Sequence, residues 1–119
     1  MESEVLTIGQ VSEKYGIPTL RIRYFCKHGL VLHVRRNSRR ERIFNLAQCE
    51  LIGILYHLYE CGLSVKELKK YVRADTIGQK AILVTHLHQL REEIKILSKN
   101  ADYLSQCEEV LDEKIGQNA

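Results

Sequence analysis

The sequence predicts a mainly α-helical protein in two parts, a small domain of short helices with one β-hairpin and then a single long helix. Helix-capping residues and glycines divide the first part into short segments. An arginine-rich turn between two apolar segments indicates the hairpin. From Leu83 onward, apolar residues recur at alternating intervals of four and three, which is typical of a coiled coil. We expect a domain at residues 1–73, a helix at 77–115 and a tail at 116–119.

Two short helices joined by a tight turn are predicted near the N-terminal end. The first spans Leu6–Gly16, where Thr7 and Gln10 fit a capping box. The second spans Thr19–His28 and follows Pro18, a residue that helices accept only at or just before their start. Helix, short turn and helix in this order form the helix-turn-helix pattern.

A β-hairpin is expected after these helices. Leu30–Val34 is apolar and β-branched, as strands are, and Arg42–Phe44 is the expected return strand. The turn between them, Arg35–Arg40, has Asn and Ser at its centre. A lone hairpin is only marginally stable, so it must pack on the helices. The first part therefore has the pattern of a winged helix-turn-helix domain.

Three more helices complete the prediction. Asn45 caps a broadly apolar helix over Leu46–Cys61, which we expect to be largely buried, and Ser64 caps the next one. The pattern is interrupted at Asp75–Gly78, and a long helix follows. Its expected contact residues are Leu83, Leu87, Leu90, Ile94, Leu97, Ala101, Leu104, Leu111 and Ile115, which we call the seam.

The seam needs a partner helix. The small first domain cannot cover it, and the chain has no other helix of this length. The simplest partner is the same helix of a second copy, which would give a two-fold homodimer. Glu108 is the one break in the seam.

Positive charge is concentrated in one block. Arg21–Arg42 contains eight basic residues and one acid, a net charge of +7, whereas residues 43–119 carry −2. A cationic block in a near-neutral chain indicates a polyanionic partner, and a helix-turn-helix makes double-stranded DNA the expected one. No apolar run is long enough to cross a bilayer, and the acidic first residues do not fit a signal peptide. We therefore expect a cytoplasmic, nucleoid-associated protein without a membrane partner.

The expected DNA contacts fall into two groups. The start of a recognition helix meets base edges in the major groove, where an arginine can pair with guanine. Basic residues of a wing more often meet phosphates, and a solvated basic face is the alternative explanation of the pattern. The candidates are Thr19, Leu20, Arg21, Arg23, Tyr24, Lys27, Arg35, Arg36, Arg39, Arg40 and Arg42.

An ordered series of short motifs resembles the MerR family of bacterial transcription regulators. The motifs are Thr7–Val11, Gly16-Ile17, Ile22–Phe25, Gly29-Leu30, Arg42–Phe44 and Gly62–Val65. The chain departs from the family pattern at Phe25, where a second Tyr is usual, and at Cys26, where an acid is usual. The wing has Arg39–Glu41 in place of Asn-Gly-Tyr.

This resemblance implies a winged helix-turn-helix followed by an antiparallel dimeric coiled coil. It implies a pseudo-palindromic promoter target, often underwound to activate transcription, with RNA polymerase as a further partner. The chain ends soon after the coil, so we expect a short member without a separate effector domain. Such members resemble metal, thiol or aldehyde sensors whose effector sites lie at or near the coil.

The four cysteines show no C-x-x-C spacing, so we expect free thiols, no bound metal and no cofactor. Cys26 lies among basic residues that are expected to lower its pKa, and Cys107 lies in the coil. These two are candidate redox or electrophile sensors, with inert thiols as the alternative. Cys49 is expected to be ordinary core. A metal site remains open only if His57, Cys61 and a residue of a second subunit converge.

Catalysis is not predicted, because the chain has no nucleophile–base pairing and no glycine-rich phosphate loop. Two other functions stay open. The protein could be a structural one that uses DNA as an anchor and the coil as its interaction module. It could also be an excisionase-like accessory factor, although such proteins generally lack so long a coil.

Overall fold

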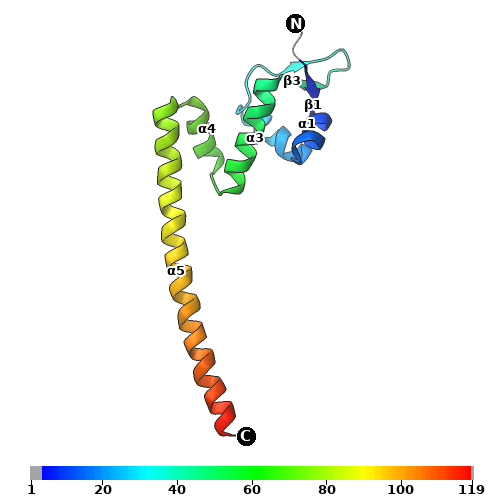
Figure 1. Ribbon diagram of the computed structural model, residues 1–119. Coiled ribbons are helices and arrows are strands. Elements are labelled where there is room, and N and C mark those ends of the chain that lie inside the picture. The colour runs from blue at the N-terminus through cyan, green and yellow to red at the C-terminus, as the bar shows by residue number, and fades with distance from the viewer. Residues whose placement is uncertain (1–3, 119) are drawn as a thin grey trace. The chain divides into compact units, whose positions relative to one another are not determined.

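The computed structural model describes residues 4–118, and its chain divides into two compact units that meet between Gln79 and Lys80. The predicted fold class is confirmed: the protein is mainly helical with one small sheet. In chain order the elements are β1 (Leu6–Thr7), α1 (Ile8–Tyr15), α2 (Thr19–Lys27), β2 (Arg35–Arg36), β3 (Arg42–Phe44), α3 (Leu46–Glu60), α4 (Val65–Arg73) and α5 (Thr76–Gln117) (Figure 1).

Capping boxes begin three of the helices; those at Thr7 and Ser64 were predicted, and at Asn45 the sequence predicted a cap but not the full box. At α1 the Thr7 hydroxyl accepts the Gln10 backbone N–H at 3.3 Å, and the Gln10 side chain accepts the Thr7 N–H at 2.8 Å. The same reciprocal pair begins α3 at Asn45 and α4 at Ser64. Each box satisfies two backbone donors that a helix start otherwise leaves unpaired. Local sequence thus sets where these helices begin.

One apolar core holds the first unit together. Its side chains come from every helix of that unit and from β3, so each element has one face against it. Burying each of these side chains stabilises the fold by roughly 2 kcal/mol. The fully buried residues, with no exposed surface, are Val11, Ile22, Phe25, Phe44, Ile52, Leu55 and Leu68.

The predicted strand at Leu30–Val34 is wrong. This segment has irregular structure, and the strand β2 is the two residues that follow it. Two neighbours, Leu30 and Val31, are both buried, so the side chains do not alternate as in a half-buried strand. His33 then adopts a left-handed conformation with φ of 59°, and the carbonyl of Leu32 accepts the Gln48 side chain at 2.9 Å. The segment is held by the core and by α3 instead of by a strand.

A third strand, β1, joins the hairpin. The sheet order is β1-β3-β2 and both pairs are antiparallel, with Leu6 opposite Phe44 and Arg36 opposite Arg42. The sequence had indicated Leu6 as part of the first helix, because a strand of two residues carries no periodic signal. With β3 in the middle, the hairpin is anchored to the helical part of the unit.

The last helix, α5, starts earlier and ends later than predicted. Only two residues, Ala74 and Asp75, separate it from α4. The Asp75 carboxylate accepts the Gly78 backbone N–H at 2.8 Å, which caps the helix start. Most of the predicted interruption is therefore helical, and α5 runs past Ile115 to Gln117, while Ala119 of the predicted tail lies outside the described residues. None of the helices among residues 4–118 has the length and apolarity to cross a membrane.

Candidate nucleic-acid interface

The outer face of α2 combines apolar, aromatic and basic side chains. Leu20 is 76% exposed, Arg23 and Lys27 are exposed, and Tyr24 is half-buried. Spacings of three and four place these four residues on one side of the helix, opposite Phe25 in the core. This face can meet both base edges and phosphates.

Arg21 occupies a different position from the other basic residues of α2. Its guanidinium carbon lies 4.1 Å from the ring centroid of Tyr59 on α3 and 5.6 Å from that of Tyr24. These are cation–π contacts, which fix the half-buried arginine at the edge of the outer face. Thr19 is half-buried as well. Arg21 therefore helps to hold α2 against α3, a role that the sequence could not show because Tyr59 is distant along the chain.

Replacing Arg21 by Ala is expected to lower the free energy of unfolding by about 1 kcal/mol, because the stacking on two rings is lost. Chemical denaturation of the free protein measures this effect. The matched control is Arg23→Ala, which removes the same charge from an exposed position of the same helix. Its expected effect stays within about 0.5 kcal/mol. Equal losses in the two variants would contradict a special role for the Arg21 contacts.

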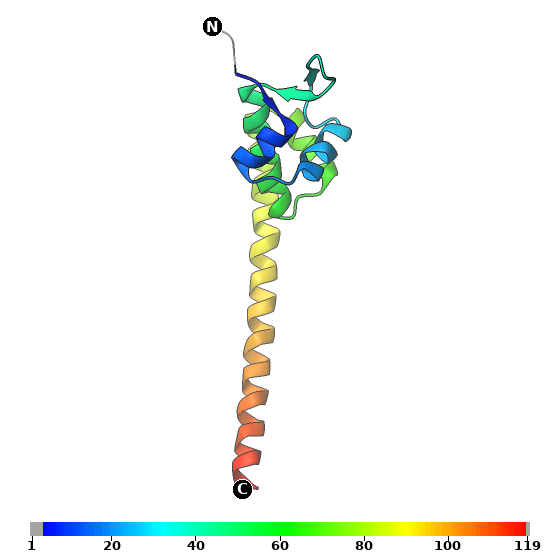
Figure 2. The ribbon, with the colours of Figure 1, turned by 90° about the vertical axis from the view of Figure 1, so that its right-hand side faces the viewer.

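The wing is the β2–β3 hairpin with its turn, and Figure 2 shows it standing away from the helices. Arg35 and Arg36 of β2 are exposed, and so are Arg39 and Arg40 of the turn. Arg42 on β3 is half-buried. The structure therefore gathers the second predicted group of candidates on one projecting hairpin.

The end of α2 and the return strand of the wing are neighbours. Arg42 lies close enough to Cys26 for its positive charge to act on the pKa of the thiol. Cys26 at the end of α2 and Arg42 of the wing are therefore near each other within the first unit. The block Arg21–Arg42 contains Glu41 as its one acid.

The expectation that basic neighbours lower the pKa of Cys26 is wrong. Burial of the thiol raises its pKa above the ordinary value of 9.0, and the charge of Arg42 only partly offsets this. Burial has the same effect on Cys49, where Lys14 opposes it. Moving a thiolate out of water raises its free energy by more than the attraction of one nearby cation lowers it. Both thiols are protonated at neutral pH, which is unfavourable for a reactive cysteine. Cys107 is half-buried on α5.

We expect the contribution of the Cys26 thiol to the stability of the fold to depend on pH. A raised pKa means that the fold favours the neutral thiol. This contribution is fully present below the ordinary value of 9.0 and is lost as the pH rises through the folded-state pKa. The melting temperature of the wild type minus that of Cys26→Ala should therefore fall as the pH rises through and above the ordinary thiol value, which is the window to measure. A difference that stays constant or grows over this window would contradict burial as the main influence.

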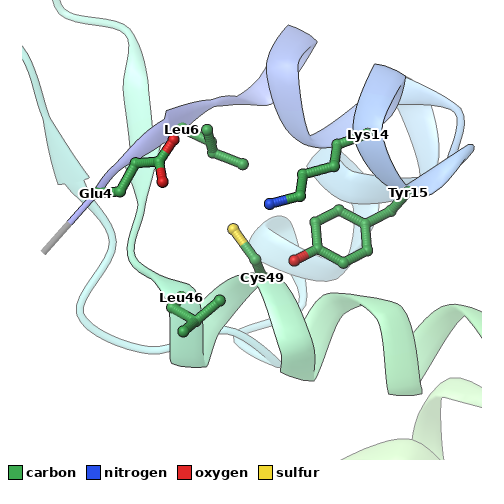
Figure 3. A pocket seen from close by; sticks show the side chains of 6 residues that line it. All are labelled: Glu4, Leu6, Lys14, Tyr15, Leu46 and Cys49. Carbon is green, nitrogen blue, oxygen red and sulfur yellow. The ribbon is translucent and has the colours of Figure 1, made fainter.

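Cys49 lies in a small pocket of the first unit with a volume of about 140 Å³. Figure 3 shows its thiol between Lys14 and Tyr15 of α1 on one side and Leu46 of α3 on the other. The side chain is 1% exposed, and its sulfur lies 3.9 Å from the Phe44 carbonyl oxygen. The prediction of Cys49 as a core residue is thus confirmed. Within residues 4–118, no three His, Cys, Asp or Glu side chains gather in a way that could hold a metal ion.

Three further cations were not singled out from the sequence. Lys66, Lys70 and Arg73 are exposed on α4, and spacings of four and three place them along one face. That spacing was visible in the sequence, but the charge count placed these residues in a near-neutral region. They enlarge the basic surface of the first unit.

The seam residues lie on one face of α5 and are mostly exposed in the single chain. Ile94, Leu97 and Leu104 are 63–67% exposed, and α5 has no buried residue. Apolar surface of this extent on one helix face is unusual unless another surface covers it. The other seam residues that are exposed are Leu83, Leu87, Ala101, Leu111 and Ile115, whereas Leu90 is half-buried.

A small helix-turn-helix unit with a basic outer helix face and a basic wing defines a DNA-binding protein of the winged-helix class. The family profile described as "MerR HTH family regulatory protein" matches residues 6–75, more than half of the chain. The chain therefore belongs to the MerR family of DNA-binding transcriptional regulators, as the motifs indicated.

Individual relatives agree with this family. An uncharacterized HTH-type transcriptional regulator of Haemophilus influenzae is 29% identical over 76 residues, a match that covers 64% of this chain and 56% of that protein. A putative MerR family regulator from Listeria monocytogenes has a similar structure, with a TM-score of 0.66 and 26% identity over 84% of this chain and 80% of its own. HiNmlR, a MerR family regulator lacking the sensor domain, was crystallised bound to promoter DNA. It has a TM-score of 0.67 at 24% identity, over 83% of this chain and 80% of its own.

Proposed function

We propose that this chain regulates transcription as a homodimer that binds a pseudo-palindromic duplex site in a promoter, where it also meets RNA polymerase. The observation that carries the proposal is the outer face of α2, where Leu20, Arg23, Tyr24 and Lys27 stand together in the same unit as the basic wing. A recognition helix of this kind reads base edges while wing arginines bind phosphates. The likeness to HiNmlR, which was solved on promoter DNA, supports the same use of the fold.

The proposed dimer is inferred from the exposed apolar seam of α5. An uncovered apolar face repeated over several heptads is stable when a second identical helix buries it, in an antiparallel arrangement as in the family. Two-fold symmetry then requires two inverted half-sites, about one or two helical turns of DNA apart. Deforming the duplex between them costs on the order of a few kcal/mol, which contacts at both half-sites offset. A stimulus that twists the coil would change the DNA geometry.

The test is a selection from a random duplex library on the purified protein, followed by hydroxyl-radical footprinting of the enriched sequences. The expected result is a pair of inverted, protected half-sites with fixed spacing. Light scattering on the same sample is expected to give twice the mass of one chain. Uniform protection without sequence preference would contradict the proposal and favour a structural DNA-anchored protein. Binding by a monomer would favour an excisionase-like accessory factor.

A further inference from the structure

Hydrogen bonds at the tip of the wing converge on one residue, Asn37. Its side-chain oxygen accepts the backbone N–H groups of Arg39 and Glu41, each at 3.0 Å. Its own backbone N–H donates to the Glu41 carbonyl at 2.9 Å, and its carbonyl accepts the Arg40 N–H at 2.9 Å. One short side chain thus substitutes for the backbone partners that the turn lacks.

The charged side chains around Asn37 are also fixed. The Asn37 side-chain amide donates to the Glu41 carboxylate at 3.2 Å, which holds the single acid of the basic block at the base of the turn. The Arg36 guanidinium donates to the Arg40 carbonyl at 2.8 Å. Arg36 therefore uses part of its hydrogen-bonding capacity within the wing, while Arg39 and Arg40 of the turn are exposed.

Arg40 has a backbone conformation that arginine seldom adopts. Its φ is 64°, in the left-handed region that normally favours glycine. Both of its backbone polar groups are held, the N–H by Asn37 and the carbonyl by Arg36. A cation kept in an unfavourable conformation on a projecting loop points to a function for its side chain.

We propose that Asn37 is a positioning residue for DNA binding, which holds the turn so that Arg39 and Arg40 face phosphates before the duplex arrives. The inference rests on the proposed DNA binding and adds the residue that organises the wing. Ordering a loop during binding reduces affinity, so an already ordered turn binds more tightly with the same charges. Asn37 acts through the two arginines and contributes no charge of its own.

If Asn37 has this role, its replacement should lower the affinity for DNA without changing the salt dependence of binding. Asn37→Ala keeps every charge, so the slope of log K against log salt concentration should equal that of the wild type. The affinity should nevertheless fall by roughly 3- to 10-fold per wing, because a loop must now be ordered on binding. Ser38→Ala, at the neighbouring turn position, is the matched control and should bind like the wild type.

A double-mutant cycle tests whether Asn37 acts through the arginines. Asn37→Ala is combined with Arg39→Ala and Arg40→Ala, and all variants are titrated against the selected duplex and checked for an unchanged melting temperature. We expect no further loss of affinity from Asn37→Ala once both arginines are absent. Amide hydrogen exchange of the free protein gives an independent measurement. Protection of the Arg39 and Glu41 N–H groups should disappear in Asn37→Ala and persist in Asn37→Asp, which keeps the acceptor oxygen.

Three outcomes would overturn the inference while the proposed function stands. Two of these are wild-type affinity in Asn37→Ala and an undiminished effect of this change without the arginines. Unchanged hydrogen-exchange protection in Asn37→Ala, measured without DNA, would also overturn the inference. Failure of the wild type to bind any duplex would instead refute the proposed function.

Discussion

Replacing Leu97 by Glu is expected to convert the homodimer into monomers and to reduce affinity for the selected duplex by more than a hundredfold, on the order of the gap between specific and non-specific binding. Leu97 lies in the middle of the seam and is 65% exposed in the single chain. In the dimer its side chain would be buried, and a carboxylate at that position would lose its hydration without gaining a partner. The first unit should still fold, since its core contains no residue of α5.

The two-fold symmetry of the dimer makes the expected effect of Leu97→Glu large. One substitution changes the interface twice, and each lost leucine contact costs roughly 2 kcal/mol before the charge is counted. The dimer dissociation constant should therefore rise by at least about a thousandfold. A monomer meets only one half-site, so it retains the non-specific part of binding and loses most of the specific part.

The matched control is Lys99→Glu, which introduces the same residue two positions later, away from the seam face. Lys99 is exposed, and its replacement should leave the dimer intact. Sedimentation velocity gives the mass of each variant, and fluorescence anisotropy gives its affinity for the duplex. A Leu97→Glu protein that remains dimeric at the concentration of the wild type would refute the seam as the dimer interface.

Removing the two arginines at the tip of the wing should weaken binding and flatten its salt dependence. Each phosphate contact contributes about 0.9 to the slope of log K against log salt concentration. A dimer of Arg39→Ala, Arg40→Ala lacks four of these cations, so the slope should fall by as much as about 3.6. At low salt the affinity loss should exceed a hundredfold, since each lost contact costs roughly 1 kcal/mol or more.

The control for this variant removes the same charge elsewhere. Lys99→Ala with Lys114→Ala takes two exposed cations from α5, the second unit, and should leave the slope nearly unchanged. Titrations at several salt concentrations measure both slopes. A wing variant whose slope equals that of the wild type would show that these arginines do not contact phosphates. Equal slopes in the two double variants would mean that only net charge matters.

Helix caps and periodic patterns, which depend on residues a few positions apart, were predicted correctly from the sequence. The capping boxes at Thr7 and Ser64 and the cap at Asn45 were predicted because both halves of such a cap lie within four positions. The long helix was predicted for a related reason, since the seam spacing repeats along one continuous segment. The helix-turn-helix followed from the capping and ending residues of two adjacent helices.

Errors arose where residues far apart in the chain decide the outcome. Leu30–Val34 has the composition of a strand, but the core takes its first two side chains and α3 binds the carbonyl of Leu32. The pKa of Cys26 was expected to follow the local charge, but burial against the rest of the domain dominates it. Both results depend on packing, which short-range patterns do not contain.

The candidate DNA-binding site shows the same division between what the sequence determines and what only the structure determines. The sequence by itself determined that basic residues cluster on one helix and one hairpin, and that α5 carries an apolar face, because charge and periodicity are properties of the chain. Only the structure decided the role of each cation, through a tertiary contact at Arg21 and through local hydrogen bonds in the wing. Arg21 is stacked on Tyr59, Arg36 is bonded into the wing, and the tip arginines are exposed on a turn ordered by Asn37. The physical reason is that contacts to a ring, a carbonyl or a buried surface depend on distance in space, which the fold alone establishes.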